Sequence, residues 1–210
     1  MRRFLLVGLT GGIATGKSTV TGLLANPSVR LVDADALARE VVEPGTPAHT
    51  QIVVEFGKDV LQPDGRLDRA RLGEIVFPDP AKRKRLEAIT HPAIRARFEK
   101  IMADLERQGL DGLLIWDAAL LVESGGHKKM DKVVVVTTDP ATQLLRLMAR
   151  DGSTEEVARA RTASQMPLAV KARAGDHVID NSGTREETAK RVREVYGALL
   201  EDLRHQQARR

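Results

Sequence analysis

Gly8-Leu-Thr-Gly-Gly-Ile-Ala-Thr-Gly-Lys-Ser-Thr19 is the stretch that decides the fold of this 210-residue chain. Within it, Gly11, Gly16, Lys17 and Ser18 have the full spacing of a phosphate-binding P-loop. The small residues let the chain curl so that backbone N–H groups point inward, and the helix that follows adds the positive end of its dipole. Lys17 can then reach the outer phosphates, and the Ser18 hydroxyl can bind Mg²⁺. The motif predicts a polyphosphate site.

The flanks of the loop have the order that the motif requires. Phe4-Leu-Leu-Val7 is a short apolar run, typical of a strand buried on both faces. Ser18 to Ala25 has helix-forming character until Asn26-Pro27 stops it. A glycine-rich surface turn would not need Lys17-Ser18 at this offset between a strand and a helix. We therefore predict a strand, a phosphate loop and a helix in sequence.

Composition indicates a globular protein with a substantial core, since 42% of its residues are hydrophobic and no linker-like stretch divides it. Cysteine is absent, which excludes disulfides and thiolate chemistry, and nothing requires an oxidising compartment. The apolar run at the start is short and passes directly into the loop, unlike a signal peptide. No apolar run approaches the roughly 20 residues that span a bilayer. We expect a cytoplasmic protein with no membrane partner.

The charge balance is only weak evidence for a nucleic-acid partner. The chain has 33 basic and 29 acidic residues, a formal net charge of +4, and only 3% aromatic residues to stack on bases. Anionic small substrates explain this balance equally well, and we expect no nucleic-acid partner. The apolar patterns are accounted for by one core and no heptad seam appears, so the oligomeric state is not determined, with a monomer favoured.

Strand and helix patterns alternate along the rest of the chain. The further strand candidates, mostly short continuous apolar runs that end in polar residues, are 29–33, 113–117, 133–137 and 177–180. The helical patterns cover 35–42, about 79–108, 140–150, 154–165 and 185–205. This alternation predicts an α/β doubly wound fold with a five-stranded parallel sheet flanked by helices, whose ligands bind at the carboxyl ends of the strands.

Two aspartates close strands at that edge. Asp33 ends the second predicted strand and Asp117 ends the third, so both can face the site. Asp33 can instead cap a helix, but Asp35 competes for that position because it precedes Ala36-Leu-Ala-Arg-Glu. We assign Asp33 a functional role and Asp35 a capping or substrate-orienting role.

Residues 44–100 form an insertion that is too long for a simple connection. Such an insertion usually recognises the second substrate, and here Arg66, Arg69 and His91 are candidates for phosphate or ribose contacts. His91 stands before Pro92, so it can also simply end one helix and start another. The consecutive charges Lys82-Arg-Lys-Arg85 must spread around a helix, which favours a solvated face.

A pair of arginine-bearing helices follows the fourth predicted strand. Arg146 and Arg150 are four residues apart, hence on one helical face. Ser153 or Thr154, followed by Glu156, indicates a helix start, so two helices meet at a hinge near Asp151-Gly152. This arrangement predicts a lid that closes on the transferring phosphate and excludes water. For each arginine, Arg161 included, a solvated surface charge is the alternative.

The P-loop alone indicates only a nucleoside triphosphate, whereas several later motifs and their separations are more specific. Together with the P-loop, the segments are Leu9–Val20, Val32-Asp-Ala-Asp35, Asp64-Gly-Arg-Leu-Asp-Arg69, Ile75-Val-Phe77, Thr90-His-Pro92, Leu120-Leu-Val-Glu123, Ser164-Gln-Met-Pro167 and Asp176-His-Val-Ile-Asp-Asn181. In these segments the chain resembles the dephospho-CoA kinase family, nearly from end to end.

The resemblance implies a P-loop kinase fold and a reaction. The chain would be a single dephospho-CoA kinase domain over 1–210, with a helical substrate-binding insertion at about 44–108 and an arginine-bearing lid at about 143–166. It would be a transferase that uses ATP and Mg²⁺ to phosphorylate the ribose 3′-hydroxyl of dephospho-CoA, the last step of coenzyme A biosynthesis. Its partner would be that small-molecule substrate.

The resemblance also implies roles for residues. Asp33 would be the catalytic carboxylate and Lys17 would stabilise the transferring phosphoryl group; Arg146 and Arg150 would belong to the lid. The ATP-binding residues would be Gly11, Gly12, Ile13, Ala14, Thr15, Gly16, Lys17, Ser18, Thr19, Arg146, Arg150, Asn181 and Gly183. The substrate-binding residues would be Asp33, Asp35, Arg69 and His91, and the metal ligand would be Ser18.

Two positions depart from the family pattern, which usually has proline where this chain has Ala119 and commonly alanine where it has Gly175. Neither change removes a charged group, so both bear on local geometry.

The residues by themselves are also compatible with three other functions. The chain can be a kinase of the same fold that acts on a nucleoside or a nucleoside monophosphate, an ATP-binding regulatory module without a small acceptor, or a nucleic-acid-binding module.

Overall fold

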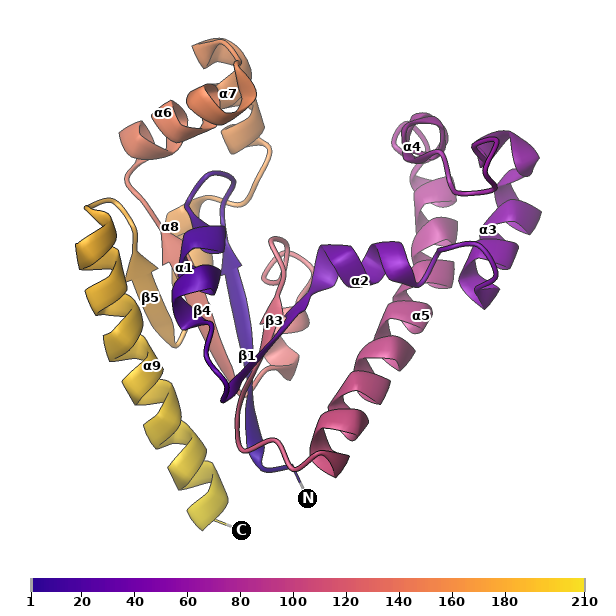
Figure 1. Cartoon of the computed structure of the whole chain (residues 1–210). Coiled ribbons are helices and arrows are strands. Elements are labelled where there is room, and N and C mark those ends of the chain that lie inside the picture. The colour runs from indigo at the N-terminus through magenta and orange to yellow at the C-terminus, as the bar shows by residue number, and fades with distance from the viewer. Residues whose placement is uncertain (1, 210) are drawn as a thin grey trace. The chain divides into compact units, whose positions relative to one another are not determined.

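The computed structural model describes residues 2–209, which form two compact units (Figure 1). One unit contains the chain up to Asp33 together with the chain from Gly109 on, and the other is Ala34–Gln108. The second unit therefore begins ten residues before the insertion expected at about 44–108. The organisation as one kinase domain with this insertion and a lid at about 143–166 stays a prediction.

The first unit is built on a parallel sheet of five strands, which confirms the predicted fold class. The strands are β1 (Phe4–Gly11), β2 (Val29–Asp33), β3 (Gly112–Asp117), β4 (Lys132–Thr137) and β5 (His177–Asp180). Their spatial order is β2-β3-β1-β4-β5, and every neighbouring pair is parallel. All five predicted strands are present. β1 extends to Gly11 because its last residues still pair with β4, with Gly11 opposite Val136.

Five helices belong to this unit: α1 (Lys17–Leu24), α6 (Pro140–Asp151), α7 (Glu155–Ala163), α8 (Leu168–Ala172) and α9 (Arg185–Ala208), with a 3-10 turn, η2 (Gly126–Lys129). Alternate strand residues, such as Leu5, Val7 and Leu9, pack into one core with residues of α1 and α9. The same alternation places Val133 and Val135 in a separate cluster with Leu121. The sheet is thus buried on both faces, as its continuous apolar strands require.

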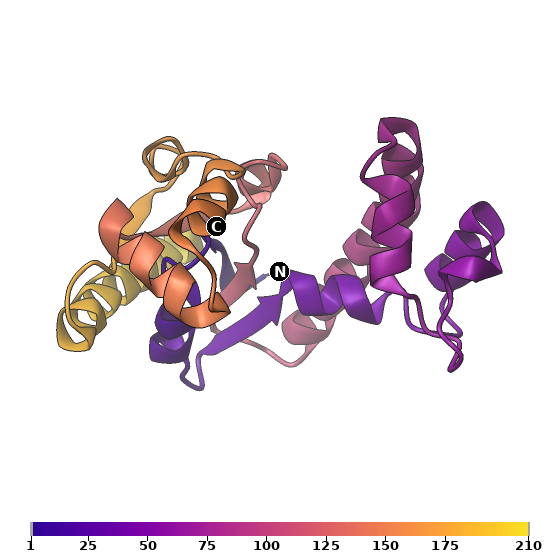
Figure 2. The same ribbon diagram turned by 90° about the horizontal axis from the view of Figure 1, so that it is seen from above.

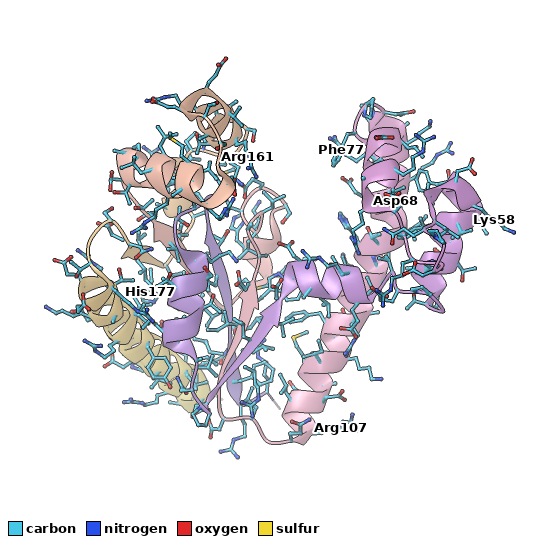
Figure 3. All side chains as sticks on the ribbon, turned by 45° about the horizontal axis from the view of Figure 1, so that its top comes forward. Lys58, Asp68, Phe77, Arg107, Arg161 and His177 are labelled. Atoms are coloured by element: carbon cyan, nitrogen blue, oxygen red, sulfur yellow. The ribbon has the colours of Figure 1, made fainter. Side chains whose placement is uncertain are left out.

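The predicted hinge between two helices is present at Gly152. This residue ends α6 in the left-handed conformation, with a φ of 62°. Thr154 then caps α7 by accepting a hydrogen bond from the Val157 backbone N–H. The result is the hairpin of α6 and α7, drawn in orange in Figures 1 and 2. Arg161, labelled in Figure 3, lies on α7.

The second unit is helical. Its elements are α2 (Ala34–Glu40), α3 (Pro47–Phe56), the 3-10 turn η1 (Lys58–Val60), α4 (Arg69–Val76) and α5 (Pro80–Arg107). Side-chain caps define three of the helix starts: Thr46 for α3, Asp68 (labelled in Figure 3) for α4 and Asp79 for α5. The unit has its own core, in which Ile52 and Val60 are fully buried.

The alternative that His91 ends one helix is wrong, because α5 runs without a break through Pro92. A proline inside a helix removes one backbone hydrogen bond. The apolar residues on either side of it, Ile89, Ala93 and Ile94, pack against the core of the second unit and hold the helix together there. Lys82, Arg83, Lys84 and Arg85 are all exposed, as the solvated-face interpretation predicts.

Within residues 2–209, none of the helices combines the length and the apolar character that crossing a bilayer demands.

Candidate active site

The loop between β1 and α1 has the backbone of a phosphate cradle. Gly16 stands immediately before α1 with a φ of 82°, a conformation that L side chains rarely adopt. Ala14, with a φ of 57°, is the one non-glycine residue with positive φ among residues 2–209. Thr15 is fully buried and closes the turn by donating from its hydroxyl to the Gly12 carbonyl at 2.9 Å. The first N–H groups of α1 lack partners within the helix and can serve an anion.

Asp33 and Asp117 lie opposite each other at the carboxyl ends of β2 and β3, as the strand pattern predicts. Asp117 is buried and forms an ion pair and hydrogen bond with the Lys17 ammonium, while the Thr21 hydroxyl donates to its other oxygen at 3.3 Å. Lys17 and Thr21 belong to α1, so Asp117 points to the α1 face of the sheet. Because paired residues of parallel strands share a face, the exposed Asp33 lies on that face too.

Asp35 does not occupy the capping position that the sequence suggests. α2 begins at Ala34, so Asp35 lies in its first turn and Asp33 is the residue directly before the helix. The helix starts one residue earlier than expected, because α2 follows β2 with no residue between them. The substrate-orienting role of the exposed Asp35 stays a prediction.

The structure brings together three residues that are predicted to bind ATP but lie far apart in the sequence. Asn181, directly after β5, is buried, and its side-chain amide donates to the Thr15 carbonyl at 2.8 Å. The Asn181 carbonyl in turn accepts from the Arg146 guanidinium at 2.8 Å. A cavity of about 260 Å³ is lined by Gly16, Thr19, Arg146, Asn181, Gly183 and Arg185. This cavity adjoins the end of the phosphate loop.

Arg150 and Arg161 have a common partner within the α6–α7 hairpin. The Arg150 guanidinium donates to Asp151 at 2.8 Å, and Arg161 forms an ion pair with the same carboxylate. The hydrogen bond from Arg150 lowers the pKa of Asp151, and the positive charge of Arg161 adds to the effect. Arg150 is exposed, whereas Arg146 is partly buried. The two helix-face arginines therefore differ: Arg146 bonds to the loop after β5, and Arg150 pairs with the next residue of its own helix. The contact that joins the two helices of the hairpin is the ion pair of Arg161 on α7 with Asp151 on α6.

Two glutamines form hydrogen bonds with the phosphate loop, and the sequence analysis did not assign a role to either. Gln165 Oε1 accepts from the Ile13 backbone N–H at 2.7 Å, and Gln143 Nε2 donates to the Ile13 carbonyl at 2.7 Å. Gln143 lies on α6, and Gln165 follows α7. The Ser164-Gln-Met-Pro167 motif was a sequence signal that could have identified Gln165. No such signal marks Gln143, which is a single glutamine inside an amphipathic helix. The two ends of the hairpin are thus hydrogen-bonded to one residue of the loop.

A cavity of about 880 Å³ lies beside these glutamines. Its walls come from the loop, the end of β4, both helices of the hairpin and α8. The lining includes Gly12, Thr138, Gln143, Thr162, Gln165 and Leu168.

Arg69 and His91 belong to the second unit. Arg69 is the first residue of α4, and His91 lies within α5. Both side chains are exposed, and α4 packs against α5. Their predicted contacts with the substrate stay predictions. Arg66, the further candidate, forms an ion pair with Glu43 at 3.5 Å within the same unit.

The two departures from the family pattern have visible surroundings. The Ala119 carbonyl accepts from the Thr10 hydroxyl at 3.0 Å and from the Lys171 ammonium at 2.9 Å, so the turn after Asp117 is held without proline. At Gly175, a Cβ atom would stand 2.7 Å from a methyl group of Val135. Gly175 therefore allows a close approach to β4 that alanine would disturb.

The oxygen ligands at this edge fit Mg²⁺ bound together with a nucleotide. Ser18 is exposed in the first turn of α1, directly after Lys17, the partner of Asp117. Among residues 2–209, there is no group of three His, Cys, Asp or Glu side chains that could hold a metal ion alone. Mg²⁺ is usually bound by one or two protein oxygens together with phosphate oxygens and water. The donor set suits that mode, with the phosphates supplied by the nucleotide.

The parallel sheet, the P-loop at its carboxyl edge and the arginine-bearing hairpin define the class: this is a P-loop kinase. The family model for dephospho-CoA kinase matches residues 5–187. The chain therefore belongs to the dephospho-CoA kinase family, a family of nucleotide-binding transferases of coenzyme A biosynthesis. Membership implies that it uses ATP and acts on a small-molecule substrate.

Relatives and solved structures agree with this assignment. The chain is 51% identical over 191 residues to a dephospho-CoA kinase of Geobacter sulfurreducens, covering 91% of this chain and 96% of the relative. It is 50% identical over 200 residues to one of Thermobifida fusca, covering 95% and 98%. The crystal structure of TT1252 from Thermus thermophilus has a TM-score of 0.79 at 32% identity, covering 93% of this chain and 97% of that one. The dephospho-CoA kinase from Campylobacter jejuni has a TM-score of 0.62 at 27% identity, covering 94% and 98%.

Proposed function

We propose that this chain transfers the γ-phosphoryl group of ATP to the ribose 3′-hydroxyl of dephospho-CoA, with Lys17 and Asp33 as its catalytic residues. Family membership supports the reaction. The observation that carries the assignment of residues is the pairing at the sheet edge, where Lys17 of the P-loop meets Asp117 and Asp33 ends the neighbouring strand. These three side chains adjoin the place where the loop would hold the triphosphate.

Asp33 is the group suited to accept the proton of the 3′-hydroxyl. As that proton moves to the Asp33 carboxylate, the ribose oxygen forms a bond to the γ-phosphorus and the bond to the β-phosphate oxygen breaks, which releases ADP. The transition state is loose, so positioning and charge neutralisation supply most of the rate.

Lys17 neutralises negative charge on the transferring group. The Lys17 ammonium forms an ion pair and hydrogen bond with Asp117. Asp117 is buried and also accepts a hydrogen bond from the Thr21 hydroxyl. The fixed carboxylate therefore keeps Lys17 in one place before the nucleotide binds. Mg²⁺ would be bound through Ser18 and the phosphates, and it would neutralise further charge on the phosphate oxygens.

The remaining site residues divide between the two substrates. We assign the P-loop residues from Gly11 to Thr19, Arg146 and Arg150 to the phosphates, and Asn181 and Gly183 to the adenine side of ATP. We assign Asp35, Arg69 and His91, together with Asp33, to dephospho-CoA. We further propose that the hairpin of α6 and α7 is the lid, that residues 44–108 hold the substrate, and that the chain acts as a cytoplasmic monomer without a nucleic-acid partner.

Asp33→Asn tests the catalytic assignment directly. Loss of the proton acceptor should lower kcat by about 100-fold or more, on the scale of a positioned general base, while the Kd for ATP stays within about twofold. Lys17→Ala should damage both ATP affinity and kcat, which makes it the matched comparison. Steady-state kinetics and ATP titration measure the two quantities. A D33N variant with wild-type kcat would remove Asp33 from the mechanism.

A further inference from the structure

A second lysine, Lys171, reaches the active-site edge from α8. Its side chain has no exposed surface, and its ammonium has three acceptors: the Glu123 carboxylate at 2.8 Å, the Ala119 carbonyl at 2.9 Å and the Gly11 carbonyl at 3.3 Å. An ammonium has three N–H donors, so this one is fully satisfied. Burying a charge is costly unless it is paired in this way, so the arrangement demands an explanation beyond packing.

The three acceptors belong to segments that frame the reaction. Gly11 is the last residue of β1 and the first of the P-loop spacing. Ala119 follows Asp117, the partner of Lys17, by two residues. Glu123 closes the Leu120-Leu-Val-Glu123 motif, to which the proposed mechanism assigns no role. Lys171 thus joins the start of the phosphate loop to the chain that carries Asp117.

Neighbouring contacts make the connection stiff. The Ala119 carbonyl also accepts from the Thr10 hydroxyl at 3.0 Å, and the Ala118 N–H donates to the Leu9 carbonyl at 3.0 Å. A displacement of Ala119 would therefore also displace the end of β1 and Asp117. A hydrophobic side chain of similar length would fill the same volume, but the Gly11 and Ala119 carbonyls would lose the ammonium donor and Glu123 would lose its ion-pair partner.

We propose that Lys171, held by Glu123, is a positioning residue that fixes the P-loop relative to Asp117 and thereby sets the position of the Lys17 ammonium. We assign it no contact with ATP or with the acceptor. The proposal rests on the proposed function for its kinetic readout, but its geometric content concerns the loop alone. We call the contacts of Lys171 with Glu123, Ala119 and Gly11 the brace. Its loss should reduce kcat more than it weakens dephospho-CoA binding, because none of the residues that we assign to that substrate contacts Lys171.

The experiment compares Lys171→Met with Lys132→Met in the full chain. Lys132 is a matched control because it is partly buried and ion-paired with Asp202 at 3.1 Å, at the amino end of β4. Steady-state kinetics are measured below the melting temperature of each variant. K171M should lower kcat at least tenfold with the KM for dephospho-CoA within twofold, and K132M should leave kcat within twofold. Loss of thermal stability in both variants with unchanged kcat would overturn the proposal.

Glu123 supplies a second test that does not depend on the folding of K171M. Glu123→Ala leaves Lys171 its two carbonyl acceptors, and the carboxylate that it removes is partly exposed. We expect kcat to fall at least fivefold and Glu123→Gln, which keeps an acceptor oxygen, to recover most of it. If both variants have wild-type kcat, the brace has no role in positioning. When K171M folds, adding E123A to it should produce no further loss of kcat, because the two residues act as a unit.

Hydrogen exchange separates failure of this proposal from failure of the proposed function. If wild-type protein shows no turnover with dephospho-CoA, the proposed function fails, but the backbone amides of Gly12, Ile13 and residues 118–121 should still exchange faster in E123A than in wild type. Unchanged exchange at these amides would overturn the brace even if the enzyme is active.

Discussion

Gly16→Ala is the perturbation that tests the geometry of the phosphate loop most sharply. At a φ of 82°, a residue with a Cβ atom costs about 1–2 kcal/mol. The new Cβ would also stand 2.0 Å from Nδ2 of Asn181, which must then move. That movement breaks the hydrogen bonds of Asn181 to the Thr15 carbonyl and from the Thr188 hydroxyl, each worth about 1 kcal/mol net. Together, the backbone strain and the two lost hydrogen bonds destabilise the native loop by about 3–4 kcal/mol.

The chain offers a matched control in the same helix. At Gly22 a new Cβ would meet nothing within 4 Å, and the residue lies inside α1. Gly22→Ala should therefore raise the free energy of unfolding by about 0.5–1 kcal/mol and leave ATP binding unchanged. For G16A, relaxation of the loop to relieve the strain should weaken ATP binding by about 100-fold, which corresponds to roughly 3 kcal/mol. Isothermal titration with ATP and thermal melting measure both effects. A G16A variant with an ATP Kd within twofold of wild type would refute the reasoning.

Three further changes test other parts of the site. Gln165→Leu leaves the Ile13 N–H without its acceptor and should raise the KM for ATP about tenfold, while Gln207→Leu, which loses contacts with Arg3 and Asp111 instead, should not; equal KM values would contradict the role of Gln165. His91→Ala should raise the KM for dephospho-CoA at least fivefold with the KM for ATP unchanged, and the reverse pattern would place His91 elsewhere. The lowered pKa of Asp151 means that its carboxylate stabilises the fold above its unfolded pKa of about 3.9 and that this contribution is lost as the pH falls through the lower folded value. Urea unfolding of wild type and Asp151→Asn should therefore differ at pH 7 and converge toward pH 2, and a constant difference would contradict this origin.

The sheet could be predicted from sequence because each of its strands is a short apolar run. The prediction stopped β1 at Val7, since the residues beyond it include Gly8, Thr10 and Gly11, which hydrophobicity does not mark as strand. Their strand geometry comes from pairing with β4, a tertiary contact. The helices α3 and α4 were not predicted individually, because the insertion that contains them was expected to be helical only from the family resemblance, without helix bounds. The helix α8 has only five residues and was not predicted.

The site could be predicted where chemistry repeats a known spacing, as in the P-loop, and where a polar residue closes a strand, as at Asp33 and Asp117. Lys171 could not, because a lysine in a five-residue helix has every mark of a surface residue. Its burial depends on acceptors that lie 160 and 52 residues away in the sequence. The helical pattern over about 79–108 predicted α5, but the alternative of a break at His91 was wrong, because packing against the second core outweighs the local preference before Pro92.

The most direct test of the central claim is the identity of the phosphorylated product. ADP release is measured with ATP and Mg²⁺ in the presence of dephospho-CoA, of nucleosides or of nucleoside monophosphates, and the product is identified by mass and by the position of the new phosphate. The account requires turnover that depends on dephospho-CoA and yields coenzyme A phosphorylated at the ribose 3′-hydroxyl. Turnover with a nucleoside or nucleoside monophosphate but none with dephospho-CoA would contradict it.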